Sequence, residues 1–113
     1  MAEDCLFLNI FAPTNATSQS KLPVLYFIQG GGFQSNSNAN FNASDLAKFG
    51  NIIVVQVNYR VGPFGFLQSK EVKAQGSLNA GLRDQIQGLK WLKQHIASVR
   101  LGPVPIPSLS YSW

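Results

Sequence analysis

Residues 23–33 read PVLYFIQGGGF, and this stretch decides the fold. Its first part, Val24–Ile28, is a continuous apolar run without alternating polar residues. Such runs are typical of strands in sheets that are covered on both faces. Three consecutive glycines, Gly30 to Gly32, then stop the strand, and glycine accepts backbone conformations that other residues avoid. The stretch therefore predicts a buried strand that opens into a glycine loop.

Two further strands are predicted on either side of this stretch. Leu6–Phe11 is apolar and partly β-favouring, and Pro13 ends it. Asn51–Asn58 contains a β-branched run, which again indicates burial on both faces of a sheet.

Two helices are predicted between and after these strands. Ser44 is expected to cap a short helix at Asp45–Phe49, and Gly50 is expected to end it. A long connection, residues 59–77, leads to a second helix at about Asn79–Val99. Its expected apolar face, which recurs at helical spacing, consists of Leu82, Ile86, Leu89, Leu92 and Ile96. Strands mixed with crossover helices predict an α/β fold.

Composition excludes several classes of protein. The 113 residues are 45% hydrophobic and 12% charged, which excludes a disordered tail or a coiled coil. The apolar runs are too short for a membrane span. Nine Lys and Arg residues against five Asp and Glu residues give a formal net charge of +4, but the basic residues form no stripe, so nucleic-acid binding is not expected. With one cysteine and one histidine, we expect no metal site and no cofactor.

Four motifs follow one another along the chain: EDCLFLNI (3–10), QGGGF (29–33), NYRVGPFGFL (58–67) and NAGLRDQ (79–85), the last followed by LKWL (89–92). In this order and at these spacings they resemble the type-B carboxylesterase and cholinesterase family of α/β-hydrolases. The resemblance implies that residues 1–99 form an incomplete domain of that fold. It would contain the N-terminal strands of the central sheet, the oxyanion loop and the helix that precedes the nucleophile elbow. In the intact family, a serine acyl-enzyme mechanism hydrolyses carboxylic esters.

The glycine loop has a chemistry of its own. Acyl transfer builds negative charge on a carbonyl oxygen, and backbone N–H groups aimed at that oxygen stabilise it. By the resemblance, Gly31 and Gly32 supply such donors here. A flexible turn between the strand and the next loop is the alternative. Gln29 stands where many members have histidine. Because the donors are backbone groups, we expect this difference to adjust the efficiency of the oxyanion site more than its function.

Arg60 and Asp84 carry opposite charges inside otherwise apolar motifs. Buried charges need partners, so we hypothesise that the two form a pair with a structural role. The pair would tie the segment after the third strand to the long helix. Two separate, solvated charges are the alternative.

Cys5 is, by the resemblance, structural: it is half of a disulfide whose other cysteine lies upstream in a missing region. It is therefore expected as a free thiol or in an intermolecular bridge. Asn15 and Asn42 begin N-glycosylation sequons, which support a secreted parent protein. Nothing before Cys5 resembles a signal peptide, so the localisation of the chain itself stays open.

The catalytic triad of the family is not found in these 113 residues. No Gly-x-Ser-x-Gly elbow occurs, and the single histidine, His95, comes before every triad position in the family order. We therefore expect the intact parent to act on an ester substrate, and this chain alone to be inactive. Residues 100–113 do not share the resemblance and are interpreted as an aberrant or disordered tail.

Two other interpretations remain open. The chain could belong to a non-catalytic binding or adhesion member of the same fold, or it could be an unrelated small α/β binding module. In either case, strands such as Val24–Ile28 are built for burial on both faces. If they lack a cover, we expect self-association through the exposed apolar strands.

Overall fold

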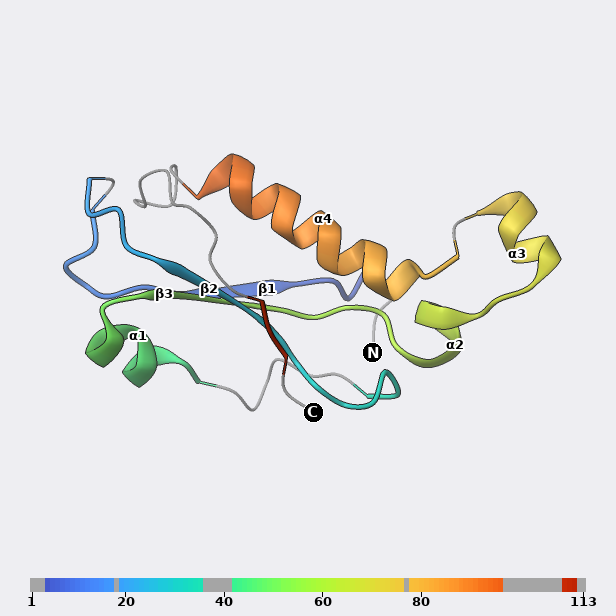
Figure 1. Ribbon diagram of the computed structural model, residues 1–113, viewed down its shortest axis with the longest axis horizontal. Helices are drawn as coiled ribbons and strands as arrows, with labels where there is room; N and C mark the ends of the chain where they lie inside the picture. The colour runs from blue at the N-terminus through green and yellow to red at the C-terminus, as the bar shows by residue number, and fades with distance from the viewer. Residues whose placement is uncertain (1–3, 18, 36–41, 77, 97–108, 112–113) are drawn as a thin grey trace.

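The computed structural model describes residues 4–17, 19–35, 42–76, 78–96 and 109–111. A twisted sheet runs through the middle of the molecule (Figure 1). The long helix α4 (Ala80–His95) lies across one face, and the short helix α1 (Ser44–Gly50) lies on the other. Two small helices, α2 (Gly62–Phe66) and α3 (Lys70–Gln75), lie at one end.

The described sheet has the strand order β1-β3-β2-β4. The strand β2 (Val24–Ile28) runs parallel to β3 (Ile53–Val57), with Tyr26 opposite Val55. The strand β1 (Leu8–Phe11) runs antiparallel to β3 on its other side. The three strands, the helix α1 between β2 and β3, and the long helix after β3 confirm the predicted α/β fold.

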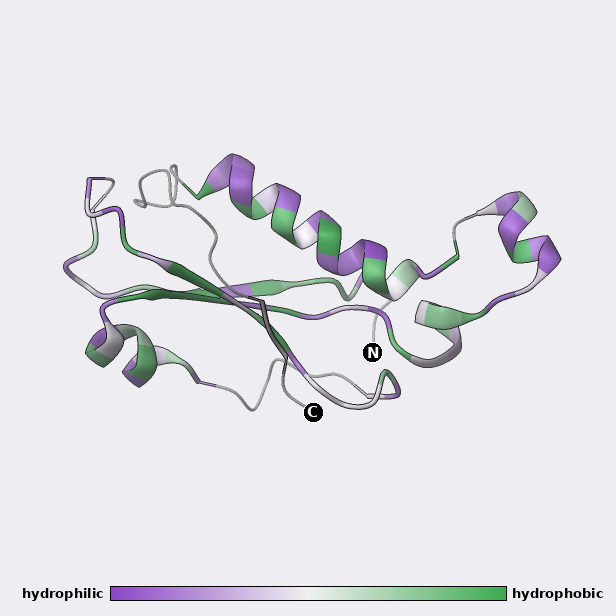
Figure 2. Ribbon diagram, viewed as in Figure 1, coloured by the Kyte–Doolittle hydropathy of each residue, from purple (hydrophilic) through white to green (hydrophobic). Residues whose placement is uncertain are grey.

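Burial follows the predicted pattern most closely in β3, where all five residues are buried. In β2, buried residues alternate with half-buried ones, because Leu25 and Phe27 face the side that α1 only partly covers. Figure 2 shows both strands as largely hydrophobic along their lengths. The larger core cluster lies between this sheet and α4, where Tyr26, Val55 and Leu92 are almost fully buried.

The end signals of α1 differ from the prediction. Ser44 is the first helical residue rather than the cap, and Ala43 holds the cap position without a side-chain hydrogen bond. The hydroxyl of Ser44 does not cap the helix, because it donates to Oδ1 of Asn42, as does the backbone N–H of Ser44. The helix also runs through Gly50, and Asn51 takes the left-handed conformation that ends it.

The connection at residues 59–77 contains α2 and α3, which were not predicted. Pro63 lies in the first turn of α2, a position that proline favours because its fixed φ angle suits the start of a helix. The side chain of Ser69 caps α3 by accepting a hydrogen bond from the N–H of Val72 at 3.1 Å.

The helix α4 buries the predicted face only in its C-terminal half. Leu89, Leu92 and Ile96 do pack against the sheet, but Leu82 and Ile86 are 43% and 51% exposed. Their places on the sheet side are taken by Gly81, Asp84, Gln85 and Gly88. The two glycines let the helix approach closely: a Cβ on Gly88 would collide with the hydroxyl of Tyr26. That hydroxyl instead donates a 2.9 Å hydrogen bond to the carbonyl oxygen of Gln85.

The strand β4 (Leu109–Tyr111) pairs in parallel with β2 and was not predicted. The sequence predicts an aberrant or disordered tail at residues 100–113. Of these residues the structure describes only 109–111, a short strand placed where β2 offers an open backbone edge. Residues 97–99 of the predicted long helix lie outside the described residues.

Candidate oxyanion loop

The glycine loop follows β2 at the carboxyl edge of the parallel β2–β3 pair. Gly31, Gly32 and Phe33 have φ angles of +145°, +57° and +59°. Glycine adopts such positive φ angles easily, whereas other residues rarely do. Gly31 has no room for a side chain, since a Cβ there would collide with the carbonyl oxygen of Ser35. The carbonyl oxygen of Gly31 accepts hydrogen bonds from the N–H groups of Gln34, at 3.0 Å, and Ser35, at 3.2 Å.

The N–H groups of Gly31 and Gly32 donate to no acceptor in the described part of the chain. Gly31 is half-buried and Gly32 is exposed, so both residues lie at the surface of the molecule. Two unpaired donors on adjacent residues at a sheet edge can hold a negatively charged oxygen. The oxyanion role that the resemblance implies for these residues stays a prediction.

The loop is fastened to the segment that follows β3. The hydroxyl of Tyr59 donates to the carbonyl oxygen of Gln29 at 2.9 Å, and the N–H of Gly62 donates to the carbonyl oxygen of Phe33 at 2.6 Å. The Phe33 ring makes edge contacts with the rings of Tyr59 and Phe66. Sequence reasoning missed these contacts, although Tyr59, Gly62 and Phe66 all lie in one of the quoted motifs.

Gln29 contributes its backbone to this arrangement. Its side-chain Oε1 accepts a long hydrogen bond, 3.4 Å, from the amide of the fully buried Gln56. Oε1 of Gln56 itself has no hydrogen-bond partner within the described residues. The position at which many family members carry histidine is thus tied to β3 by its side chain.

The structure brings Arg60 and Asp84 together. Nη2 and Nε of Arg60 donate to the two carboxylate oxygens of Asp84 at 2.7 and 2.8 Å, and the backbone N–H of Arg60 adds a third bond at 3.0 Å. The Asp84 side chain is only 6% exposed, whereas that of Arg60 is 44% exposed. Burial acts to raise the pKa of Asp84, but the hydrogen bonds and charge of Arg60 together hold this pKa below its usual value. The hydrogen bond to Asp84 likewise raises the pKa of Arg60.

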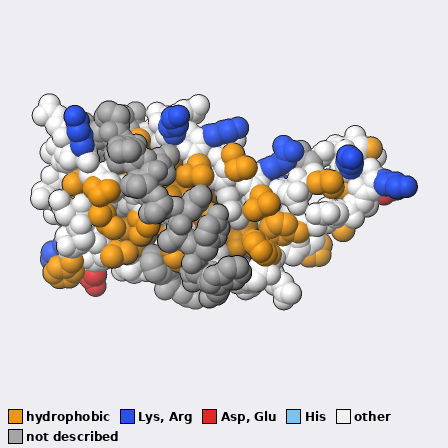
Figure 3. All heavy atoms as spheres, viewed as in Figure 1, with side chains coloured by type: hydrophobic (Ala, Val, Ile, Leu, Met, Phe, Trp, Pro, Cys, Tyr) orange, Lys and Arg blue, Asp and Glu red, His pale blue; other side chains and the backbone are white. Residues whose placement is uncertain are grey.

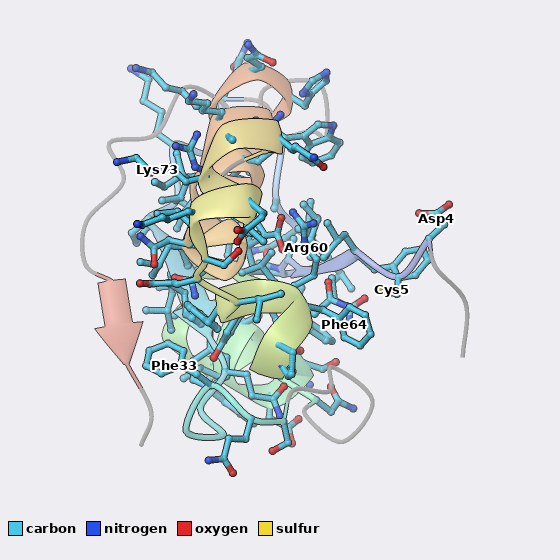
Figure 4. The ribbon with its side chains drawn as sticks, turned by 90° about the vertical axis from the view of Figure 1, so that its right-hand side faces the viewer. Asp4, Cys5, Phe33, Arg60, Phe64 and Lys73 are labelled. Carbon is cyan, nitrogen blue, oxygen red and sulfur yellow. The ribbon has the colours of Figure 1, made fainter. Side chains whose placement is uncertain are left out.

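The other sequence-predicted residues lie apart from the loop. Cys5 is an exposed free thiol, and Figure 4 shows it on the N-terminal segment, pointing away from the body of the molecule. Both sequon residues, Asn15 and Asn42, are exposed. His95 ends α4, with its ring stacked on Trp91 and its Nδ1 2.8 Å from the Trp91 carbonyl oxygen.

A cavity of about 360 Å³ opens between β1 and α4. Apolar side chains from Leu6, Phe7 and Trp91 line it together with Asn58 and Asp84. None of its lining residues belongs to the glycine loop, so the cavity is separate from the candidate oxyanion site.

The sheet, the loop after β2 and the covering helices define a partial α/β-hydrolase fold, and solved esterases share it. The crystal structure of Aspergillus niger EstA matches 93% of this chain with a TM-score of 0.83 and 51% sequence identity. The chain belongs to the carboxylesterase family, whose model matches residues 1–99.

Relatives of this chain include two fungal lipases. Secreted lipase 1 of Botryotinia fuckeliana is 50% identical over 101 residues, which are 85% of this chain and 18% of that lipase. Lipase 2 of Geotrichum candidum is 43% identical over 103 residues, 87% of this chain and 18% of that protein. The chain also covers only 21% of EstA. It spans about a fifth of the length of such relatives, and it corresponds to an N-terminal part of the esterase fold that does not cover their catalytic residues.

Proposed function

We propose that this chain supplies the oxyanion donors of a serine carboxylic ester hydrolase. The observation that supports this proposal is the pair of unpaired N–H groups on Gly31 and Gly32, at the carboxyl edge of the β2–β3 pair. When a nucleophile attacks an ester, the carbonyl oxygen becomes an oxyanion, and these donors would stabilise it. One such donor is worth about 2.7–4 kcal/mol of the activation free energy.

The remaining steps of the reaction need groups that residues 1–113 do not offer. No Gly-x-Ser-x-Gly elbow is present, and the ring of His95 is engaged by the backbone and the indole of Trp91. Without a nucleophile and a base oriented toward it, no acyl-enzyme forms. We therefore expect the purified 113-residue chain to show no turnover of a p-nitrophenyl ester above a buffer blank.

A chimaera tests the positive part of the proposal. Residues 4–96 of this chain would replace the matching segment of EstA, which supplies the rest of the fold. We expect this chimaera to hydrolyse p-nitrophenyl acetate. A chimaera that folds but shows no hydrolysis would overturn the proposed function and favour a non-catalytic member of the fold.

Two glycine substitutions sharpen this experiment. Gly31→Ala places a methyl group against the Ser35 carbonyl at a φ of +145°, so the loop must rearrange. We expect kcat to fall by about 100-fold or more, the range seen when one oxyanion donor is lost. Gly76→Ala is the matched control, because Gly76 has an ordinary φ and, among the described residues, its Cβ would meet only the Val72 carbonyl oxygen at 3.6 Å. This control should keep the kcat of the unsubstituted chimaera.

The parent protein is further proposed to be secreted, with Asn15 and Asn42 as glycosylation sites. Both side chains are exposed, and one relative is a lipase named as secreted. Cys5 is proposed to pair with an upstream cysteine, which its exposure on the N-terminal segment permits. Expression with a secretion leader, followed by glycosidase treatment and mass spectrometry, tests the glycosylation. An unchanged mass would refute it.

We also propose that the isolated chain self-associates. The outer edge of β1 is unpaired in the described sheet, and neighbouring Leu6 and Phe7 are 45% and 61% exposed. Leu82 and Ile86 add apolar surface on the outside of α4. Figure 3 shows hydrophobic side chains at several places on one face of the molecule. Open strand edges next to apolar surface favour association.

No helix in the described part of the chain combines the length and the apolar character that a membrane crossing requires.

A further inference from the structure

The oxyanion loop is fixed at both of its ends by one short segment, residues 59–62. At the first end, the hydroxyl of Tyr59 donates to the Gln29 carbonyl oxygen at 2.9 Å. At the other end, the N–H of Gly62 donates to the Phe33 carbonyl oxygen at 2.6 Å. The residues between these two points are the three glycines.

These two bonds restrict how the donors can point. A peptide unit is planar, so the bond to the Gln29 carbonyl also sets the direction of the N–H of Gly30. Gly31 and Gly32 are conformationally permissive, and their φ angles of +145° and +57° are not enforced by side chains of their own. The N–H of Gly32 shares a peptide plane with the Gly31 carbonyl, which the N–H groups of Gln34 and Ser35 also hold. The direction of the Gly31 N–H therefore depends most on where the first end of the loop is held.

The aromatic contacts hold the same arrangement from the outside. Phe33 has a φ of +59°, which is rare for a bulky residue, and its side chain is not deeply buried. Its ring lies edge-on to Tyr59 and Phe66, with centroid distances of 6.3 and 5.0 Å. Figure 4 shows Phe33 beside α2, the helix that contains Phe66.

The fastening segment is itself rigidly placed. Tyr59 is 5% exposed, and the next residue, Arg60, makes three hydrogen bonds to Asp84 of α4. The Phe66 ring packs so closely on α4 that a Cβ on Gly81 would lie 2.7 Å from it. The helix α4 thus holds the segment after β3 in place, and that segment holds the glycine loop.

We propose that Tyr59 is a positioning residue for the oxyanion donors and acts through the backbone carbonyl of Gln29. The inference rests on the proposed function of the loop. Tyr59 has no role in binding the ester; its hydroxyl holds the loop in the conformation that leaves the Gly31 and Gly32 donors unpaired.

The chain offers a matched control for Tyr59. The hydroxyl of Tyr26 also donates to a backbone carbonyl, that of Gln85, and also at 2.9 Å. Tyr59→Phe and Tyr26→Phe therefore remove the same kind of bond, one from the loop and one from α4. In the chimaera, we expect Tyr59→Phe to lower kcat about five-fold with KM unchanged, the effect of losing one typical hydrogen bond. Tyr26→Phe should lower the melting temperature but keep kcat.

Amide hydrogen exchange in the full 113-residue chain gives a second readout. Tyr59→Phe should accelerate the exchange of the Gly62 amide, which reports on the far end of the loop, about five-fold. Tyr26→Phe should leave this exchange rate unchanged. If Tyr59 had only a general structural role, both substitutions would change the exchange rate of the Gly62 amide alike.

The outcomes separate the two proposals. An active chimaera whose kcat is the same with Tyr59→Phe overturns the positioning role and leaves the proposed function intact. An inactive chimaera overturns the proposed function and this inference with it. Should Tyr59→Phe fail to fold, Phe33→Ala tests the same fastening from its exposed side, and an unchanged kcat there also overturns the inference.

Discussion

Asp84→Asn is the substitution that tests most directly how the fold is held together. The change keeps the size of a side chain that is only 6% exposed, but it removes the charge. The carboxylate accepts hydrogen bonds from Nε, Nη2 and the backbone N–H of Arg60. An amide offers one acceptor oxygen, so at least one of the guanidinium bonds is lost.

The magnitude follows from the burial of the two partners. Removing one partner of a fully buried pair costs about 3–5 kcal/mol. The Arg60 side chain is 44% exposed and can recover part of its hydration, which reduces the cost. We expect the free energy of unfolding to fall by about 2 kcal/mol, which raises the unfolding equilibrium constant by about 30-fold.

Urea unfolding followed by far-UV circular dichroism measures this loss, at low micromolar protein to limit association. Arg60→Met and the double variant complete a thermodynamic cycle. The double variant should be more stable than the sum of the single losses implies. Additive losses would refute the idea that the two side chains interact. A charge swap is a poorer test, because the backbone N–H of Arg60 also requires an acceptor at position 84.

The same pair predicts a pH dependence. The pKa of Asp84 is lower in the folded chain than in the unfolded chain, so the unfolded chain binds the proton more tightly. The contribution of Asp84 to stability is therefore complete above the unfolded pKa of about 3.9 and is lost as the pH falls through the lower, folded value. The difference between the wild type and Asp84→Asn should stay constant from pH 7 to 5 and shrink below pH 4. A constant difference down to pH 2 would contradict the assigned pKa direction.

Three further variants probe other parts of the fold. Gly88→Ala should destabilise the chain by about 1–3 kcal/mol in urea unfolding, because its methyl group meets the hydroxyl of Tyr26; adding Tyr26→Phe should recover part of the loss. The pair Leu82→Ser and Ile86→Ser removes exposed apolar surface from α4 and should shift the sedimentation of the isolated chain toward monomer, whereas unchanged sedimentation would place the association elsewhere. Ser69→Ala removes the cap of α3 and should cost about 1 kcal/mol locally, seen as faster amide exchange in that helix but not in β3.

The strands and the glycine loop could be predicted because their signals are local. A continuous apolar run such as Val24–Ile28 is buried wherever the sheet is covered, and three glycines end a strand in almost any context. The small helices α2 and α3 also had local signals, Pro63 and Ser69, which were outweighed by the glycines around them.

The orientation of α4 could not be predicted from its apolar residues. Periodicity counts Leu82 and Ile86 as core positions and gives no weight to Gly88. The structure reverses this, because Tyr26 needs both the space above Gly88 and the carbonyl of Gln85. Likewise, the role of Tyr59 depends on a contact across 30 positions of sequence, which no local pattern contains.

Because α4 holds the segment after β3 and that segment holds the glycine loop, a substitution in α4 can disturb the loop without touching it. Gly81 lies in a helix outside the loop, yet a side chain there would collide with the Arg60 carbonyl oxygen and with the Phe66 ring that supports Phe33. A genetic screen of the chimaera for lost ester hydrolysis would therefore recover changes in the first turn of α4 alongside those in the loop. Such a map of inactivating variants would outline the support of the loop as well as the loop itself.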